Sequence, residues 1–126
     1  MLYLSIEDIL RLHHSIIDDF GGSHGLRDEK QLLSVVESPK LEVFEQEQYP
    51  SVFDRAAVYA RNIIADHPFI DGNKRSGITC AGVFLLLNGQ SLISVPKDLE
   101  DFAVKIAVDH LSVETISDWL KQNSKI

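Results

Sequence analysis

The chain of 126 residues has a single cysteine, Cys80, so it cannot form an internal disulfide bond. This excludes the small secreted proteins that depend on several disulfides for stability. A chain of this length buries about two-thirds of its unfolded surface and can fold without covalent crosslinks. We therefore predict one domain over residues 1–126.

Basic residues and long apolar runs are also scarce. Lysine and arginine number 12 against 19 aspartate and glutamate residues, which gives a net charge of −7. Such a surface disfavours nucleic acid, because affinity for a duplex comes mainly from neutralising its phosphates. The apolar runs are far shorter than the ~20 residues of a bilayer span, and residues 1–9 do not resemble a signal peptide. We expect a cytoplasmic protein that binds no nucleic acid directly and no membrane.

Metal-ligand motifs such as HExxH are absent, which disfavours a metal hydrolase. His14 and Asp18 are spaced as half of a metal site on a helix. They lack a third ligand at helical spacing, so the preferred interpretation is a hydrogen-bonded structural histidine. Cys80 has apolar neighbours and no basic one in sequence, which favours a structural thiol over a nucleophile.

The sequence instead contains six stretches with the 3.6-residue period of helices, most of them preceded by a capping residue or a proline. They begin after Ser5, after Asp28, after Ser51, at Asn73, at Pro96 and after Ser112. We predict an all-α, compact fold. The stretch Asn73–Leu87 is apolar almost all round, which is typical of a central buried helix. The segment Ser91–Val95 is expected to be extended.

The segment Lys40–Pro50 has no helical period and carries the polar run Glu45-Gln46-Glu47-Gln48. The simplest interpretation of this composition is a solvated loop.

Between two predicted helices lies the sequence HPFIDGNKR, from His67 to Arg75. A loop that leads directly into a helix N-terminus presents free N–H groups and the positive end of the helix dipole, so it binds phosphate well. Lys74 and Arg75 oppose that dipole unless an anion lies beside them. The alternative is an ordinary turn at Asp71-Gly72 followed by a solvated first turn of helix.

These residue types suggest specific roles. Asp71 provides a carboxylate for Mg²⁺, and His67 provides a general base for an incoming hydroxyl. Gly72 and Asn73 would position phosphate, while Lys74 and Arg75 would neutralise its charge. On either interpretation Phe69 is expected to anchor the loop in the core.

HPFIDGNKR resembles the HxFx(D/E)GNGRxxR signature of the Fic/Doc superfamily and is most similar to its death-on-curing (Doc) branch. The upstream stretch Gly21–Pro39 is similar to the GG-x-x-G-x-RD segment of Doc-like proteins. Two positions depart from the Fic signature: Lys74 replaces a glycine and Ile78 replaces the second arginine.

The resemblance implies a Fic/Doc-type helical domain and a nucleotide-dependent protein transferase that uses ATP and Mg²⁺. Fic members are adenylyltransferases, which transfer AMP. Doc members are toxins that act as kinases on elongation factor Tu and inhibit translation. Lys74 partly fills the space for terminal phosphates and Ile78 removes one phosphate ligand, so we favour phosphoryl transfer over AMP transfer. A catalytically silent partner-binding module is a further alternative.

The resemblance also bears on the segment Lys40–Pro50. In the family the corresponding region forms a flap over the active-site entrance that binds a target segment, often by strand addition, and apolar residues such as Phe44 suit that role. The solvated loop and the flap both stay open.

The resemblance also implies how the protein is restrained. Fic enzymes carry an inhibitory (S/T)xxxE(G/N) helix, and no segment of this chain matches that pattern. Restraint would then come from an antitoxin whose C-terminal segment folds on the toxin as an inhibitory helix.

Overall fold

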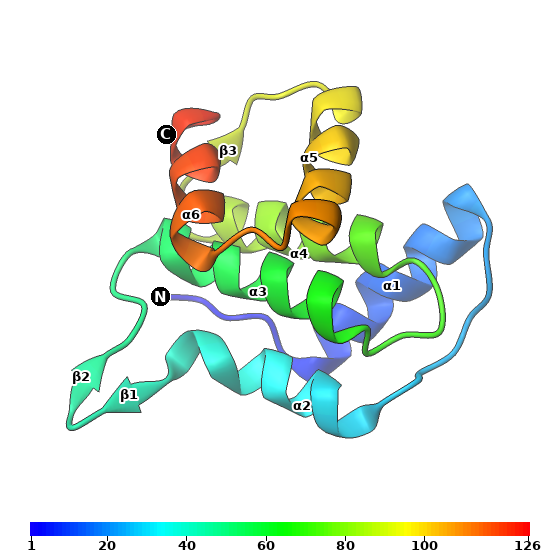
Figure 1. Ribbon diagram of the computed structural model, residues 1–126, viewed down its shortest axis with the longest axis horizontal. Coiled ribbons are helices and arrows are strands. Elements are labelled where there is room, and N and C mark those ends of the chain that lie inside the picture. The colour runs from blue at the N-terminus through cyan, green and yellow to red at the C-terminus, as the bar shows by residue number, and fades with distance from the viewer.

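The computed structural model describes residues 1–126 and contains six α-helices (Figure 1). Their bounds are α1 Ile6–Phe20, α2 Glu29–Glu37, α3 Val52–Asp66, α4 Asn73–Leu87, α5 Pro96–Asp109 and α6 Val113–Gln122. A 3-10 turn, η1, covers Ser38–Lys40. The strands are β1 Glu42–Val43, β2 Gln46–Glu47, β3 Ser91–Leu92 and β4 Ser124–Lys125, which form two antiparallel pairs. The predicted all-α class is confirmed.

Local capping chemistry determines where most helices begin. Ser5 and Asp8 form a reciprocal capping box, with Asp8 N–H donating to Ser5 Oγ at 3.1 Å and Ser5 N–H donating to Asp8 Oδ2 at 2.9 Å. These hydrogen bonds lower the pKa of the Asp8 carboxyl. Asp28, Ser51 and Ser112 cap α2, α3 and α6 in the predicted positions.

Helix α4 is the central helix, as predicted, and it packs against α1, α3 and α5. Its buried residues are Ser76, Gly77, Ile78, Cys80, Ala81, Phe84 and Leu85. Close approach to α3 depends on Gly77, because a Cβ there would lie 2.7 Å from Ile64 Cγ1 and 3.0 Å from the Ala60 carbonyl oxygen. Burial raises the pKa of the Cys80 thiol to about 12, which agrees with a structural thiol.

The segment Lys40–Pro50 contains a β-hairpin, in which Val43 pairs with Gln46. Phe44 and Glu45 form its turn with positive φ angles of 52° and 65°, and Phe44 is 95% exposed. The hairpin precedes α3, whose 15 residues span about 22 Å at 1.5 Å per residue. It therefore lies at the opposite end of α3 from His67 (Figure 1), away from the 67–75 loop.

The two chain ends are fixed by contacts that the sequence did not reveal. Near the N-terminus, Leu2 and the side chain of Asn88 exchange two hydrogen bonds of 2.8 Å. Near the C-terminus, β4 pairs with β3, which adds a strand partner to the predicted extended segment. No helix has the length and hydropathy that crossing a bilayer requires.

Candidate active site

Helix α4 begins with an uncapped N-terminus. Its N-cap, Gly72, has φ +77°, and a Cβ there would lie 2.9 Å from Ile17 Cδ1, so glycine is required for conformation and for space. No side chain caps the helix, and the N–H groups of Asn73, Lys74 and Arg75 have no acceptor in the structure. Three free donors and the helix dipole make this end of α4 a favourable position for an anion.

The loop before α4 is held rigidly from within. The side chain of Asn73 accepts a hydrogen bond from Phe69 N–H at 3.1 Å and donates one to the Phe69 carbonyl at 2.9 Å. Phe69 is 1% exposed and stacks on the His13 ring, with 3.7 Å between centroids. The predicted anchoring role of Phe69 is thus confirmed. Since the Asn73 amide is occupied, its predicted contact with phosphate would use its backbone N–H.

His13 holds the loop from the side of α1. Its Nε2 lies 2.8 Å from the carbonyl oxygen of Asp71, which can only accept, so Nε2 carries the proton and donates. His13 is 4% exposed and lies on the buried face of α1 with Ile9, Ile16 and Ile17. Burial lowers its pKa, and the hydrogen bond to Asp71 opposes this shift only in part.

The segment after α1 runs along the loop and orients the Asp71 carboxylate. Ser23 N–H donates to Asp71 Oδ2 at 3.1 Å, and Gly72 N–H donates to Oδ1 at 2.8 Å. A Cβ at Gly22 would lie 2.6 Å from Oδ2, so this contact requires glycine. Further along, Ile70 N–H donates to the Gly25 carbonyl at 3.0 Å.

Asp71 fits the predicted Mg²⁺ role in its chemistry. Each carboxylate oxygen accepts one backbone N–H and keeps a lone pair, and the residue is exposed beside the cavity described below. Oxygen donors of this kind are the ligands that Mg²⁺ prefers, with water and phosphate completing the shell.

A cavity of about 490 Å³ opens at the N-terminus of α4, between the end of α1 and α5. Its lining residues are Phe20, Asp71, Gly72, Asn73, Lys74, Arg75, Ile78, Thr79, Pro96, Leu99, Glu100, Ala103 and Val104. The structure therefore brings five predicted site residues, Asp71 to Arg75, to one wall. The volume of the cavity is within the usual range of small-molecule sites.

The two cations at this wall differ in their contacts. Lys74 is exposed and has no hydrogen-bond or ion-pair partner within the protein. Arg75 lies over the Phe20 ring, 3.9 Å from its centroid, and its guanidinium is 3.4 Å from Glu100 Oε1. Arg75 is thus positioned by its neighbours, whereas Lys74 is free to meet a ligand.

His67 lies at the other end of the loop, as the C-cap of α3, with φ 49°. Its side chain is exposed and is not among the residues that line the cavity. Arg27 fixes this turn, because its guanidinium donates to the carbonyls of His67 and Asp66, the latter at 2.6 Å. These bonds satisfy carbonyls that the helix end leaves unpaired.

The sequence predicts no role in the site for Arg27, Phe20 or Glu100. The signal for Arg27 was present, since it belongs to the upstream segment on which the family resemblance rests. Phe20 and Glu100 had no such signal, because they reach Arg75 from other helices.

Comparison with known proteins agrees with this geometry. A family model described as the Fic/DOC family matches residues 3–85. The chain is 29% identical over 122 residues to "Protein kinase doc" of Escherichia phage P1, an alignment that covers 97% of this chain and 95% of the relative. It is 36% identical over 107 residues to "Toxin Doc" of Mycolicibacterium smegmatis, covering 85% of this chain and 75% of that relative.

Proposed function

Because the chain belongs to the Fic/DOC family, we propose that it is a Doc-like toxin that transfers the γ-phosphoryl group of ATP to a serine or threonine hydroxyl of another bacterial protein. The observation that carries the proposal is the uncapped N-terminus of α4, where three free N–H groups and the unpaired Lys74 border one cavity. Such an end stabilises phosphate charge with little reorganisation during the reaction.

In the proposed reaction the acceptor oxygen forms a bond to the γ-phosphorus while the bond to the bridging β–γ oxygen breaks, and ADP leaves. His67 takes the proton of the hydroxyl as general base. The free N–H groups of Asn73, Lys74 and Arg75 orient phosphate, and Gly72, which has no side chain, lets it approach the backbone closely. The side chains of Lys74 and Arg75 neutralise charge in the transition state. Asp71 would hold Mg²⁺, which when bound supplies further positive charge beside the phosphates.

Two side chains favour phosphoryl transfer over AMP transfer. Lys74 and Ile78 both line the cavity, at the two positions that depart from the Fic signature. The lysine occupies space that a glycine would leave for terminal phosphates, and the isoleucine offers no donor where an arginine would bind them. The nucleotide is therefore proposed to bind with its γ-phosphate towards the acceptor. Elongation factor Tu is the proposed target, by analogy with the family.

We also propose that an antitoxin restrains the protein with a helix at its C-terminus. The cavity has an apolar side formed by Phe20, Pro96, Leu99, Ala103 and Val104. An amphipathic helix would place its apolar face against this side and so cover the N-terminus of α4.

The test of the reaction is intact-mass measurement of elongation factor Tu and other candidate bacterial proteins after incubation with the chain, ATP and Mg²⁺. Addition of a phosphate is the expected result, whereas addition of AMP would replace the kinase proposal with the alternative chemistry. No modification of any candidate by the folded, nucleotide-binding chain would favour a silent binding module.

The same assay tests the general base with an unusually close control. His67→Ala should slow transfer by about 10²- to 10⁴-fold with nucleotide affinity nearly unchanged. His110 is also an exposed, left-handed C-cap histidine, with φ 50° at the end of α5, so His110→Ala bears the same backbone cost without touching the loop. Unaltered transfer in His67→Ala, or equal losses in both variants, would contradict the assignment.

A further inference from the structure

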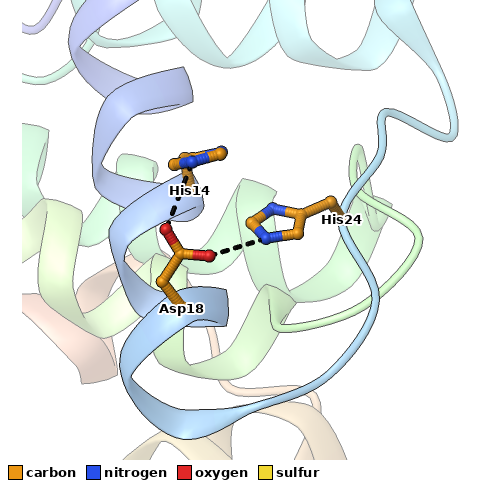
Figure 2. Close-up of side chains that lie close together, drawn as sticks. All are labelled: His14, Asp18 and His24. Carbon is orange, nitrogen blue, oxygen red and sulfur yellow. Dashed lines mark hydrogen bonds and ion pairs between the residues drawn. The ribbon is translucent and has the colours of Figure 1, made fainter.

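Three side chains outside the 67–75 loop converge on the surface beside α1 (Figure 2). His14 and Asp18 lie one turn apart on α1, and His24 comes from the segment that follows this helix. His14 Nε2 is 3.2 Å from Asp18 Oδ2, and His24 Nε2 is 2.9 Å from Asp18 Oδ1. We propose that these three residues form a binding site for a divalent transition-metal ion, with Zn²⁺ as the expected ion.

The donor set selects the class of metal. Two imidazole nitrogens and one carboxylate oxygen suit Zn²⁺, Co²⁺ and Ni²⁺, whereas Mg²⁺ and Ca²⁺ prefer oxygen donors alone. All three residues are exposed, so water can complete the coordination shell. The site is therefore chemically distinct from the Mg²⁺ position proposed at Asp71.

The spacing of the donors also fits a metal. Bonds of about 2.0–2.2 Å in a tetrahedral shell separate neighbouring ligand atoms by roughly 3.3–3.6 Å. The two nitrogen–oxygen distances, 3.2 and 2.9 Å to different oxygens of Asp18, are shorter than this by a few tenths of an ångström. One ligand atom from each residue gives a set of three that lie within 4.8 Å of one another. Small side-chain rotations would bring all three atoms to one ion.

A plain hydrogen-bond network is the alternative to a metal site, with each neutral imidazole donating its Nε2–H to one oxygen of Asp18. The two imidazole rings lie 4.4 Å apart between centroids and both direct Nε2 at the same carboxylate, one at each oxygen. In such a network each Nε2 keeps its proton, whereas a metal ion binds an Nε2 atom that carries none. An ion bound here would replace both protons and would lie beside the negative charge of Asp18.

The position of His24 gives this site a structural consequence. Its neighbours Ser23 and Gly25 both form hydrogen bonds with the 67–75 loop. Ser23 N–H donates to the Asp71 carboxylate, and the Gly25 carbonyl accepts from Ile70 N–H. An ion bound to His24 and to α1 would tie this segment to the helix and suppress local opening. The orientation of Asp71 would then depend on the occupancy of a site that takes no part in the proposed chemistry.

Calorimetric titration of the full chain with Zn²⁺, with excess Mg²⁺ present, tests the proposal directly. One Zn²⁺ per chain is expected, and titration with Co²⁺ should give the visible absorption of a cobalt ion held by nitrogen and oxygen ligands. His24→Gln and Asp18→Asn should each weaken binding by at least the roughly 10- to 100-fold that outer-shell changes cost. His110→Gln and His67→Gln should bind as the unaltered chain does.

Since all three ligands are exposed, circular dichroism should show that the variants stay folded. Absence of Zn²⁺ binding by the unaltered chain would overturn the proposal. So would binding that survives in both His24→Gln and Asp18→Asn, or that is lost in His67→Gln. None of these results depends on transferase activity, so this site and the proposed function fail or succeed separately.

Discussion

At the residue scale, the chemistry of the site depends on two positions that differ from the Fic signature. Lys74 has no partner in the protein, and Ile78 is 6% exposed at the wall of the same cavity. The double variant Lys74→Gly, Ile78→Arg should lose phosphoryl transfer and gain some AMP transfer, because it restores room and a donor for terminal phosphates. The measurement is the mass added to the target protein. Efficient AMP transfer by the unaltered chain would show that the nucleotide binds in the other direction.

His13 makes the stability of the protein depend on pH. Because burial lowers its pKa in the folded state, the unfolded chain binds more protons than the folded one below the ordinary histidine pKa of about 6.5. This contribution to stability is complete above that pH and is lost as pH falls through the lower, folded-state pKa. His13→Gln keeps an N–H donor for the Asp71 carbonyl and does not titrate.

Urea unfolding at several pH values tests this expectation. The free energy of unfolding of the unaltered chain should fall more steeply below about pH 6.5 than that of His13→Gln. Parallel curves for the two proteins would show that His13 has the same pKa in both states.

At the scale of elements, the packing of α4 on α3 determines where the 67–75 loop lies. Alanine substitutions at two glycines of α4 distinguish the effect of this packing on stability from the effect of helix propensity. Gly77→Ala places a Cβ against Ile64 and the Ala60 carbonyl, and such overpacking costs roughly 1–3 kcal/mol. Gly82→Ala meets only Leu92, at 3.4 Å, and should gain up to about 1 kcal/mol from helix propensity. Opposite shifts in the urea midpoint are expected. A gain at both positions would mean that α3 can move away from α4 without cost.

At the scale of the whole molecule, the proposed toxin function predicts an effect on the cell. Expression of this chain alone should slow bacterial growth, and the effect should vanish with His67→Ala but persist with His110→Ala. Growth should recover when the proposed antitoxin is expressed as well, because its helix would cover the cavity beside α4. Harmless expression of a chain with proven transferase activity would contradict the toxin proposal and leave the transferase proposal intact.

The sequence by itself determined the helices, most of their caps and the loop that leads into α4. These features depend on neighbours three or four residues apart, such as Ser5 with Asp8, and on the apolar periodicity of each stretch. The sequence also predicts an anion site at Gly72-Asn73 and the two cations that follow, because the free N–H groups of a helix start are a local property.

Only the tertiary structure decided which distant residues meet. Arg27 reaches the carbonyls at the end of α3, and Ser23 reaches Asp71, across separations of 39 and 48 positions in the chain. The sequence spacing indicated only His14 and Asp18 as possible ligands. His24 completes this cluster because the chain turns at Gly21 and the following segment lies beside α1. Local helix and turn propensities do not predict such contacts. The contacts form because Phe69 and Ile17 are buried together with the segments that carry them.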